Sequence, residues 1–187
     1  MSRTTRAQRR ETDRMSDIAF RVMILLFRLL DFVYPYIDKR VKAFGIRPGM
    51  TVVDYGCGPG RYTLRFAGLV GQTGKVYAVD VHELAIEAVS KKVASSGLGN
   101  VETALATGYE SGLSDDIADV ICALDMFFGV RDPSSFLAEL HRILKPDGVL
   151  VIDDGHQSRK TTKRKIAASG QWAIREETKD HLKCTPQ

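Results

Sequence analysis

The sequence predicts an α/β fold in which a doubly wound parallel sheet is covered by helices on both faces. From Pro48 onward, short apolar runs alternate with amphipathic segments, which is the pattern of strand–helix–strand units. Ala118–Leu124 is apolar apart from Asp119, as in a strand that is buried on both faces. A glycine-rich corner, Gly56–Gly60, joins the first apolar run to a helix. Together these features indicate a nucleotide-binding type of sheet.

The first half of the pattern alternates strands and helices in a regular order. We expect strands at Thr51–Asp54, Lys75–Asp80 and Val101–Thr107, because each run is short and contains several apolar residues. The helices between them carry apolar residues from 62 to 70 and over Leu84–Ala94. Gly97 follows the second helix, where a left-handed residue commonly ends a helix.

The second half continues the alternation. Ser134–Leu144 is expected to be an amphipathic helix. Lys145–Gly148 contains proline and glycine and is expected to end this helix before a strand at Val149–Asp153. Ser158–Ser169 is expected to be a helix with a basic exposed face. The last strands are expected at Trp172–Thr178 and His181–Thr185. With no internal repeat or linker, residues 45–187 are expected to form one domain.

The N-terminal part differs in character. Residues 1–14 are polar and basic and are expected to be disordered. Ile18–Tyr34 is strongly apolar, but charges interrupt it, and a spanning helix needs about 20 predominantly apolar residues. We interpret 15–44 as an amphipathic helical segment, and four roles are open to it. It packs on the core, or Phe27–Tyr36 forms a lid over the site. Alternatively it forms a dimer contact, or residues 18–34 lie on a membrane surface. The interrupting charges are Arg21, Arg28 and Asp31.

Composition narrows the class of protein. A chain of 187 residues with 44% hydrophobic and 27% charged residues is typical of one globular domain. The net charge of +4 is too modest to indicate nucleic acid as a partner. Cys57, Cys122 and Cys184 are far apart, so neither a disulfide framework nor a metal site is expected. A reducing, cytoplasmic location is the expectation.

The glycine corner carries the strongest functional signal. Ligands of doubly wound sheets bind beyond the carboxyl ends of the strands, and glycine lets the backbone approach them closely. A dinucleotide-binding corner would need a third glycine at the position of Arg61, whereas here it comes one residue earlier, at Gly60. A phosphate-binding P-loop is excluded, because no Gly-Lys-Ser/Thr follows. Asp80 is suitably placed for a ribose-binding acid with any adenosine ligand.

At these residues the sequence resembles a known family. Asp54–Gly60, which reads DYGCGPG, is similar to motif I of the class I S-adenosylmethionine-dependent methyltransferases, and Asp80 resembles the acid closing their second motif. Asp132–Ile152 is similar to the helix and fifth strand of the type 11 or type 25-like branch. The resemblance covers about Ile46–Asp153. It implies a three-layer Rossmann-like fold with seven strands, the last antiparallel, and S-adenosylmethionine as cofactor, with S-adenosylhomocysteine as product.

The resemblance also implies which residues hold the cofactor. The corner glycines would lie against its methionine part and ribose, and the acid after the second strand would bind the ribose hydroxyls. The residues after the second and third strands would surround the adenine, and those after the fourth would reach the methyl-donor end. The expected set is Asp54, Tyr55, Gly56, Cys57, Gly58, Gly60, Asp80, Val81, His82, Thr107, Gly108, Tyr109 and Leu124.

The acceptor side is less defined by the sequence. Methyl transfer from a sulfonium requires positioning and exclusion of water, and a base only where the acceptor keeps its proton near neutral pH. Asp125 and His156 are the candidate catalytic residues, with a nearby carboxylate orienting His156; a solvated loop histidine is the alternative. Phe127 and Phe128 either line an apolar acceptor pocket or pack in the core.

Three functions follow as hypotheses. The first is methyl transfer to a small apolar or aromatic acceptor, with no nucleic acid as partner. The second is methyl transfer to protein or RNA through the basic N-terminus and Arg159–Lys165. The third is cofactor binding without catalysis, because many relatives carry an acid where Gly108 stands and histidines where Met126–Val130 stands.

Overall fold

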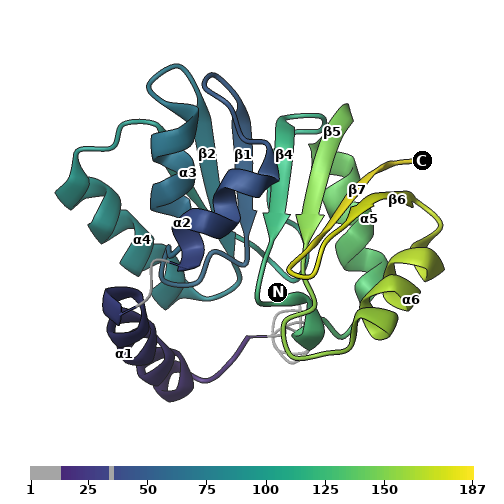
Figure 1. Cartoon of the computed structure of the whole chain (residues 1–187). Coiled ribbons are helices and arrows are strands. Elements are labelled where there is room, and N and C mark those ends of the chain that lie inside the picture. The colour runs from purple at the N-terminus through teal and green to yellow at the C-terminus, as the bar shows by residue number, and fades with distance from the viewer. Residues whose placement is uncertain (1–13, 34–35) are drawn as a thin grey trace, which may run out of the picture.

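The computed structural model describes residues 14–33 and 36–187 and contains one seven-stranded sheet with the order β3-β2-β1-β4-β5-β7-β6 (Figure 1). The strands are β1 (Thr51–Tyr55), β2 (Lys75–Asp80), β3 (Val101–Leu105), β4 (Ala118–Ala123), β5 (Leu144–Ile152), β6 (Trp172–Glu177) and β7 (Leu182–Pro186). β7 is antiparallel to both of its neighbours, and the pairs from β3 to β5 are parallel. The predicted fold class is confirmed.

The helices cover both faces of this sheet. They are α1 (Asp17–Val33), α2 (Tyr36–Val41), α3 (Thr63–Val70), α4 (Glu83–Ser96), α5 (Pro133–Ile143) and α6 (Arg159–Ser169), with short 3-10 helices η3 (Lys42–Phe44) and η4 (Phe127–Gly129). Because side chains alternate along a strand, neighbouring residues of β1 enter different cores. Val52 packs with Phe66 of α3 on one face, and Val53 packs with Phe136 of α5 on the other.

The strand order places a binding crevice beside β1. β1 pairs with β2 on one side and with β4 on the other, so the order of the sheet reverses between β1 and β4. Ligands of open α/β sheets bind at such a switch point, beyond the carboxyl ends of the strands. In Figure 1 the arrowheads of β4 and β5 point to the lower edge of the sheet, and α1 lies on that side, below α4.

Two strands, β3 and β5, differ from their predicted bounds by more than one residue. β3 ends at Leu105 because the chain then turns: the Thr107 N–H bonds to the Glu110 carbonyl and the Glu110 N–H bonds back. β5 begins at Leu144, not after a break at 145–148, because Leu144 already pairs with Ala118. The proline and glycine of this segment fall within an irregular stretch of the strand.

The N-terminal segment consists of α1, α2 and η3, where the sequence predicted one helical segment. The predicted disordered tail lies outside the described residues, apart from residue 14, and so do residues 34 and 35 and the side chains of 27–36 in the predicted lid. In the part of the chain that the structure describes, no helix has the length and apolar character needed to span a membrane. The three cysteines are buried and free.

Candidate active site

A cavity of about 360 Å³ lies at the switch point of the sheet. The loops after β1, β2, β3 and β4 contribute to its walls, and so does Phe136 of α5. The N-terminal segment contributes Arg14, Met15, Phe20 and Met23. Its volume lies in the range of small-molecule sites, about 300–1,000 Å³. The cavity is therefore built from distant parts of the sequence.

The corner after β1 presents bare backbone to this cavity. Gly58 has a φ of +51°, and a Cβ there would meet only the Met23 methyl, 4.0 Å away. The Gly58 N–H donates to Oδ2 of Asp80 at 2.9 Å, while the Gly56 and Cys57 N–H groups bond to the Val79 carbonyl. The loop is thus fixed against β2, and its open side faces the cavity.

Asp80 ends β2 and lines the same cavity. Its Oδ2 accepts from the Gly58 N–H and its Oδ1 from the His82 N–H, both at 2.9 Å. Burial raises the pKa of Asp80, and the two backbone donors oppose that rise because they favour the ionised form. A carboxylate held in this way retains free lone pairs for hydroxyl donors on a ligand.

His82 connects the cavity wall to two helices. Its Nδ1 accepts from the Leu84 N–H at 3.2 Å, so its side chain caps the N-terminus of α4. Its ring stacks on Phe20 of α1 with centroids 4.2 Å apart, and its Nε2 lies 3.5 Å from the Asp17 carboxylate of α1. Burial lowers the pKa of His82.

A polar network of Arg40, Tyr62, Asp125 and Asp153 lies where the cavity meets the end of β4, and we call it the cavity floor. Asp125, with a φ of +57°, accepts from the Tyr62 hydroxyl at 3.0 Å and lies 3.4 Å from Nη1 of Arg40. The same Nη1 donates to the Tyr62 hydroxyl at 2.7 Å. The Asp125 N–H donates to both oxygens of Asp153, at 2.9 and 3.0 Å. Asp125 is therefore held on both its backbone and its side chain.

Arg40 was not found from the sequence, although it organises this floor. It lies on α2 three residues after the buried Ile37 and next to the buried Val41, so an arginine on the apolar face of a short helix was the available signal. Its Nη2 donates to Asp153 and, at 3.0 Å, to the Asp180 carbonyl. Burial and the nearby Asp125 raise the pKa of Asp153 to about 6, against the opposing effect of Arg40.

The two neighbouring phenylalanines after β4 have different environments. Phe127 is fully buried and packs against Phe136, with ring centroids 5.8 Å apart. Phe128 is 40% exposed and lines the cavity together with Met126 and Val130. One ring therefore belongs to the core and the other to the cavity.

Most of the residues predicted for the site meet at this cavity. Those that line it are Tyr55, Gly56, Cys57, Gly58, Asp80, Val81, His82, Gly108, Tyr109, Leu124 and Asp125. Residues that line it but were not predicted include Phe20, Met23, Tyr62 and Met126. The signal for Phe20 and Met23 was weak, because an apolar residue on an amphipathic helix is as easily explained by packing.

Four predicted residues lie elsewhere. Asp54 is buried and accepts from the Thr63 hydroxyl at 2.5 Å, and burial raises its pKa to about 7. A Cβ on Gly60 would meet the Val89 side chain at 3.0 Å, and Thr107 pairs with Glu110. His156 is exposed and meets the edge of the Phe128 ring, with centroids 4.7 Å apart. These residues support the walls of the cavity rather than line it.

The carboxylates beside His156 are engaged by other groups. Asp153 pairs with Arg40, and Nε of Arg159 bonds to both oxygens of Asp154, at 2.9 and 2.8 Å. The geometry therefore does not reproduce the predicted carboxylate–histidine pair.

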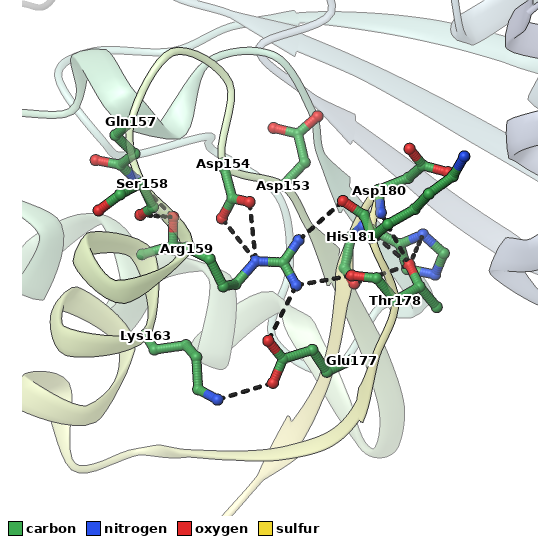
Figure 2. A network of polar contacts seen from close by, with 12 residues as sticks. Asp153, Asp154, Gln157, Ser158, Arg159, Lys163, Glu177, Thr178, Asp180 and His181 are labelled. Carbon is green, nitrogen blue, oxygen red and sulfur yellow. Dashed lines mark hydrogen bonds and ion pairs between the residues drawn. The ribbon is translucent and has the colours of Figure 1, made fainter.

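The predicted basic face of α6 is partly neutralised by the same interactions. Figure 2 shows Arg159 between Asp154 and Glu177, with Lys163 on the other oxygen of Glu177. Lys165 donates to the Phe127 carbonyl at 3.1 Å, and its ammonium lies 4.9 Å from that ring centroid. These basic residues tie α6 to the sheet and to the loop after β4.

A glycine corner, a ribose-type acid and a switch-point cavity are the features of an adenosine-cofactor site, and comparison with known proteins decides the family. The model of a methyltransferase domain family matches residues 46–183. The chain belongs to the class I S-adenosylmethionine-dependent methyltransferases.

Relatives agree with this assignment. The methyltransferase is 35% identical over 113 residues to the Escherichia coli ubiquinone/menaquinone biosynthesis C-methyltransferase UbiE, which covers 60% of this chain and 45% of the relative. The structure of this chain is similar to that of a SAM-dependent methyltransferase from Aquifex aeolicus, with a TM-score of 0.73 and 29% identity. The match covers 80% of this chain and 87% of that one. A coclaurine N-methyltransferase bound to N-methylheliamine and S-adenosylhomocysteine matches with a TM-score of 0.56, 25% identity, and coverage of 63% and 33%. The methyltransferase thus spans less than half the length of the curated relatives it matches.

The cofactor of this methyltransferase is S-adenosylmethionine, and the residues present fit it. The space above Gly58 admits a ligand where a Cβ would intrude, and Asp80 presents a carboxylate to the same space. When bound, the cofactor supplies a methyl group on a sulfonium that is already reactive toward a nucleophile.

Proposed function

We propose that this methyltransferase transfers a methyl group to a small, apolar or aromatic acceptor that binds in the cavity against Phe128. The single observation that carries the proposal is the apolar character of the wall near the end of β4, where Met126, Phe128 and Val130 face the cavity. An apolar lining with few polar groups favours a ligand of the same character.

The names of the curated relatives support a small-molecule acceptor. They are C-methyltransferases of ubiquinone/menaquinone biosynthesis, matched over 60% of this chain. We extend to this methyltransferase only the class, a small molecule with an apolar body.

Within the proposal, the cofactor is held by the corner and by the two loops beside it. Gly56 and Gly58 would lie against its methionine part and ribose, and Asp80 would accept from the ribose hydroxyls. His82 and Tyr109 would flank the adenine. These assignments rest on the motif resemblance and on the shared position of all five residues at the cavity.

Asp125 is proposed as a positioning residue rather than a base. Its oxygens already interact with the Tyr62 hydroxyl and with Arg40, which fixes the carboxylate at the cavity floor. In that position it can accept a hydrogen bond from a donor on the bound molecules. His156 would act only on an acceptor that reaches past Phe128, because the imidazole contacts that ring and is not part of the cavity lining. Positioning and exclusion of water are then the chief contributions of the protein.

The experiment has a binding step and a transfer step. Calorimetry should detect binding of S-adenosylmethionine and S-adenosylhomocysteine by the full chain. Asp80→Asn should weaken that affinity by roughly tenfold or more, since a hydrogen bond to a charged group contributes about 1.5–3 kcal/mol. Asp147→Asn is the matched control, because this exposed aspartate lies at the start of β5, on the opposite edge of the sheet.

The transfer step uses cofactor labelled in its methyl group. Label should enter the organic-soluble small-molecule fraction of a cell extract. Label in RNA or protein would overturn the proposal in favour of a macromolecular acceptor, and RNA affinity would then be salt-dependent. Binding of the cofactor with no labelled product in any fraction would indicate a cofactor-binding protein without catalysis.

A further inference from the structure

Over residues 17–26, where the structure describes its side chains, the helix α1 has two apolar faces, and only one of these packs on the protein. On the inner face Phe20 is buried and Met23 is partly buried, and both line the cavity. On the outer face the exposed fractions are 77% for Ile18, 62% for Val22 and 70% for Leu25. Leu26 beside them is 52% exposed. This outer stripe has the i, i+4, i+7, i+8 spacing of one helix face.

The outer stripe is unusual within this protein. Of the seven exposed large hydrophobic residues in the described part of the chain, five lie between Met15 and Leu26, and the other two are Leu105 and Phe128. Scattered exposed apolar residues need no explanation, but a contiguous stripe marks a surface that another molecule covers.

Charge indicates what covers it. Arg21 is exposed on the same helix, and residues 1–14, which precede α1, contain five arginines against one aspartate and one glutamate. In a symmetric dimer built on this stripe both copies would carry the same excess of basic residues, so neither copy would supply the charge that complements the other. An anionic lipid surface attracts the same segments.

We propose that the outer stripe of α1, formed by Ile18, Val22, Leu25 and Leu26, docks the protein onto anionic membrane surfaces. The helix would lie in the plane of the interface with this stripe among the acyl chains, while Arg21 remains at the headgroups. Because Phe20 and Met23 on the opposite face line the cavity, α1 would separate the bilayer from the site by one helix diameter. The inference is independent of the acceptor proposed above.

The test is flotation of the full chain with vesicles of phosphatidylcholine, alone or mixed with phosphatidylglycerol. Binding should be stronger to the anionic vesicles by about tenfold or more, and added salt should weaken it. The double variant Val22→Gln with Leu25→Gln keeps good helix formers on α1 and should reduce binding by about tenfold or more. Leu105→Gln, an exposed leucine at the end of β3, is the control and should bind as the wild type does.

S-adenosylhomocysteine affinity and sedimentation are measured on the same variants. Affinity for S-adenosylhomocysteine should be the same in the double variant and the wild type, which verifies that the variant is folded. Wild-type protein that fails to float with anionic vesicles, or a double variant that floats as the wild type does, would overturn the proposal. So would sedimentation that reveals a wild-type dimer lost in the double variant, because a second copy would then cover the stripe.

Discussion

The guanidinium of Arg40 is paired with the carboxylate of Asp153, and the two side chains are only 6% and 4% exposed. The two residues are 113 positions apart, one on α2 and the other directly after β5. Their contact joins the N-terminal segment to the carboxyl edge of the sheet, where Asp153 also holds the backbone of Asp125.

This pair predicts a large stability effect. Arg40→Met should lower the free energy of unfolding by about 3–5 kcal/mol, because it leaves a buried carboxylate without its partner. Adding Asp153→Asn should recover part of the loss. Urea denaturation measures the free energy of unfolding of the single and the double variant. Arg65→Met, which breaks a more exposed pair with Asp38, should cost about 1 kcal/mol or less; an equal cost for both arginines would contradict the prediction.

The exposed backbone at Gly58 predicts that a Cβ there weakens cofactor binding, whereas an equally strained substitution away from the cavity changes only the free energy of unfolding. Gly58→Ala places a Cβ in the cavity and should weaken S-adenosylhomocysteine affinity by about tenfold or more. Gly97→Ala is matched in strain, since Gly97 has a φ of +64° and open space around it at the end of α4. Each variant should lose about 1–2 kcal/mol of stability, from the left-handed backbone. Calorimetry that finds the same affinity in both variants would refute the cofactor position.

The buried carboxyl of Asp54 predicts a pH dependence. Its pKa is raised from 3.8 to about 7, so the folded state holds this proton more tightly than the unfolded state does. Its contribution to stability is therefore fully present below about pH 4 and is lost as pH rises through about 7. Asp54→Asn cannot ionise and keeps an oxygen for the Thr63 hydroxyl.

The stability of Asp54→Asn relative to the wild type should thus increase from about pH 5 to about pH 8 in urea denaturation. The buried residues His82 and His181, whose pKa values are lowered, titrate in both proteins and cancel in this difference. A difference that is constant with pH would show that Asp54 does not titrate in this range.

The adjacent phenylalanines predict opposite phenotypes. Phe127→Ala removes a fully buried ring and should cost about 3–5 kcal/mol in the free energy of unfolding. Phe128→Ala should cost about 1 kcal/mol or less, because the ring is partly exposed, yet it should reduce methyl transfer to the acceptor. Labelled-methyl transfer assays and thermal unfolding check the pair. Unchanged transfer in Phe128→Ala would count against an acceptor bound beside that ring.

The sequence predicted the parts of the molecule that local patterns determine. Strand runs, the helix-ending Gly97 and the corner at Gly56–Gly60 lie close to their predicted positions, because each depends on neighbouring residues. Alternation along β1 also explains Asp54: it shares a face with Val52, toward α3, and so meets Thr63 rather than the ligand.

The remaining parts of the site depend on contacts between distant segments. Arg40 acquires its role only when α2 packs beside the ends of β4 and β5, and Phe20 only when α1 crosses the cavity. Phe127 and Phe128 are chemically identical neighbours, and the turn at η4 determines which ring faces inward. Hydrophobic periodicity does not contain this information.

His82 makes mutagenesis at the site harder to interpret than the cavity lining implies. One imidazole nitrogen completes the first turn of α4, and the ring supports Phe20 of α1. Its removal would fray one helix and loosen another at the same time. A loss of ligand affinity in such a variant could then result from the loosening of α1 and of the first turn of α4, even if the imidazole itself never contacts the adenine.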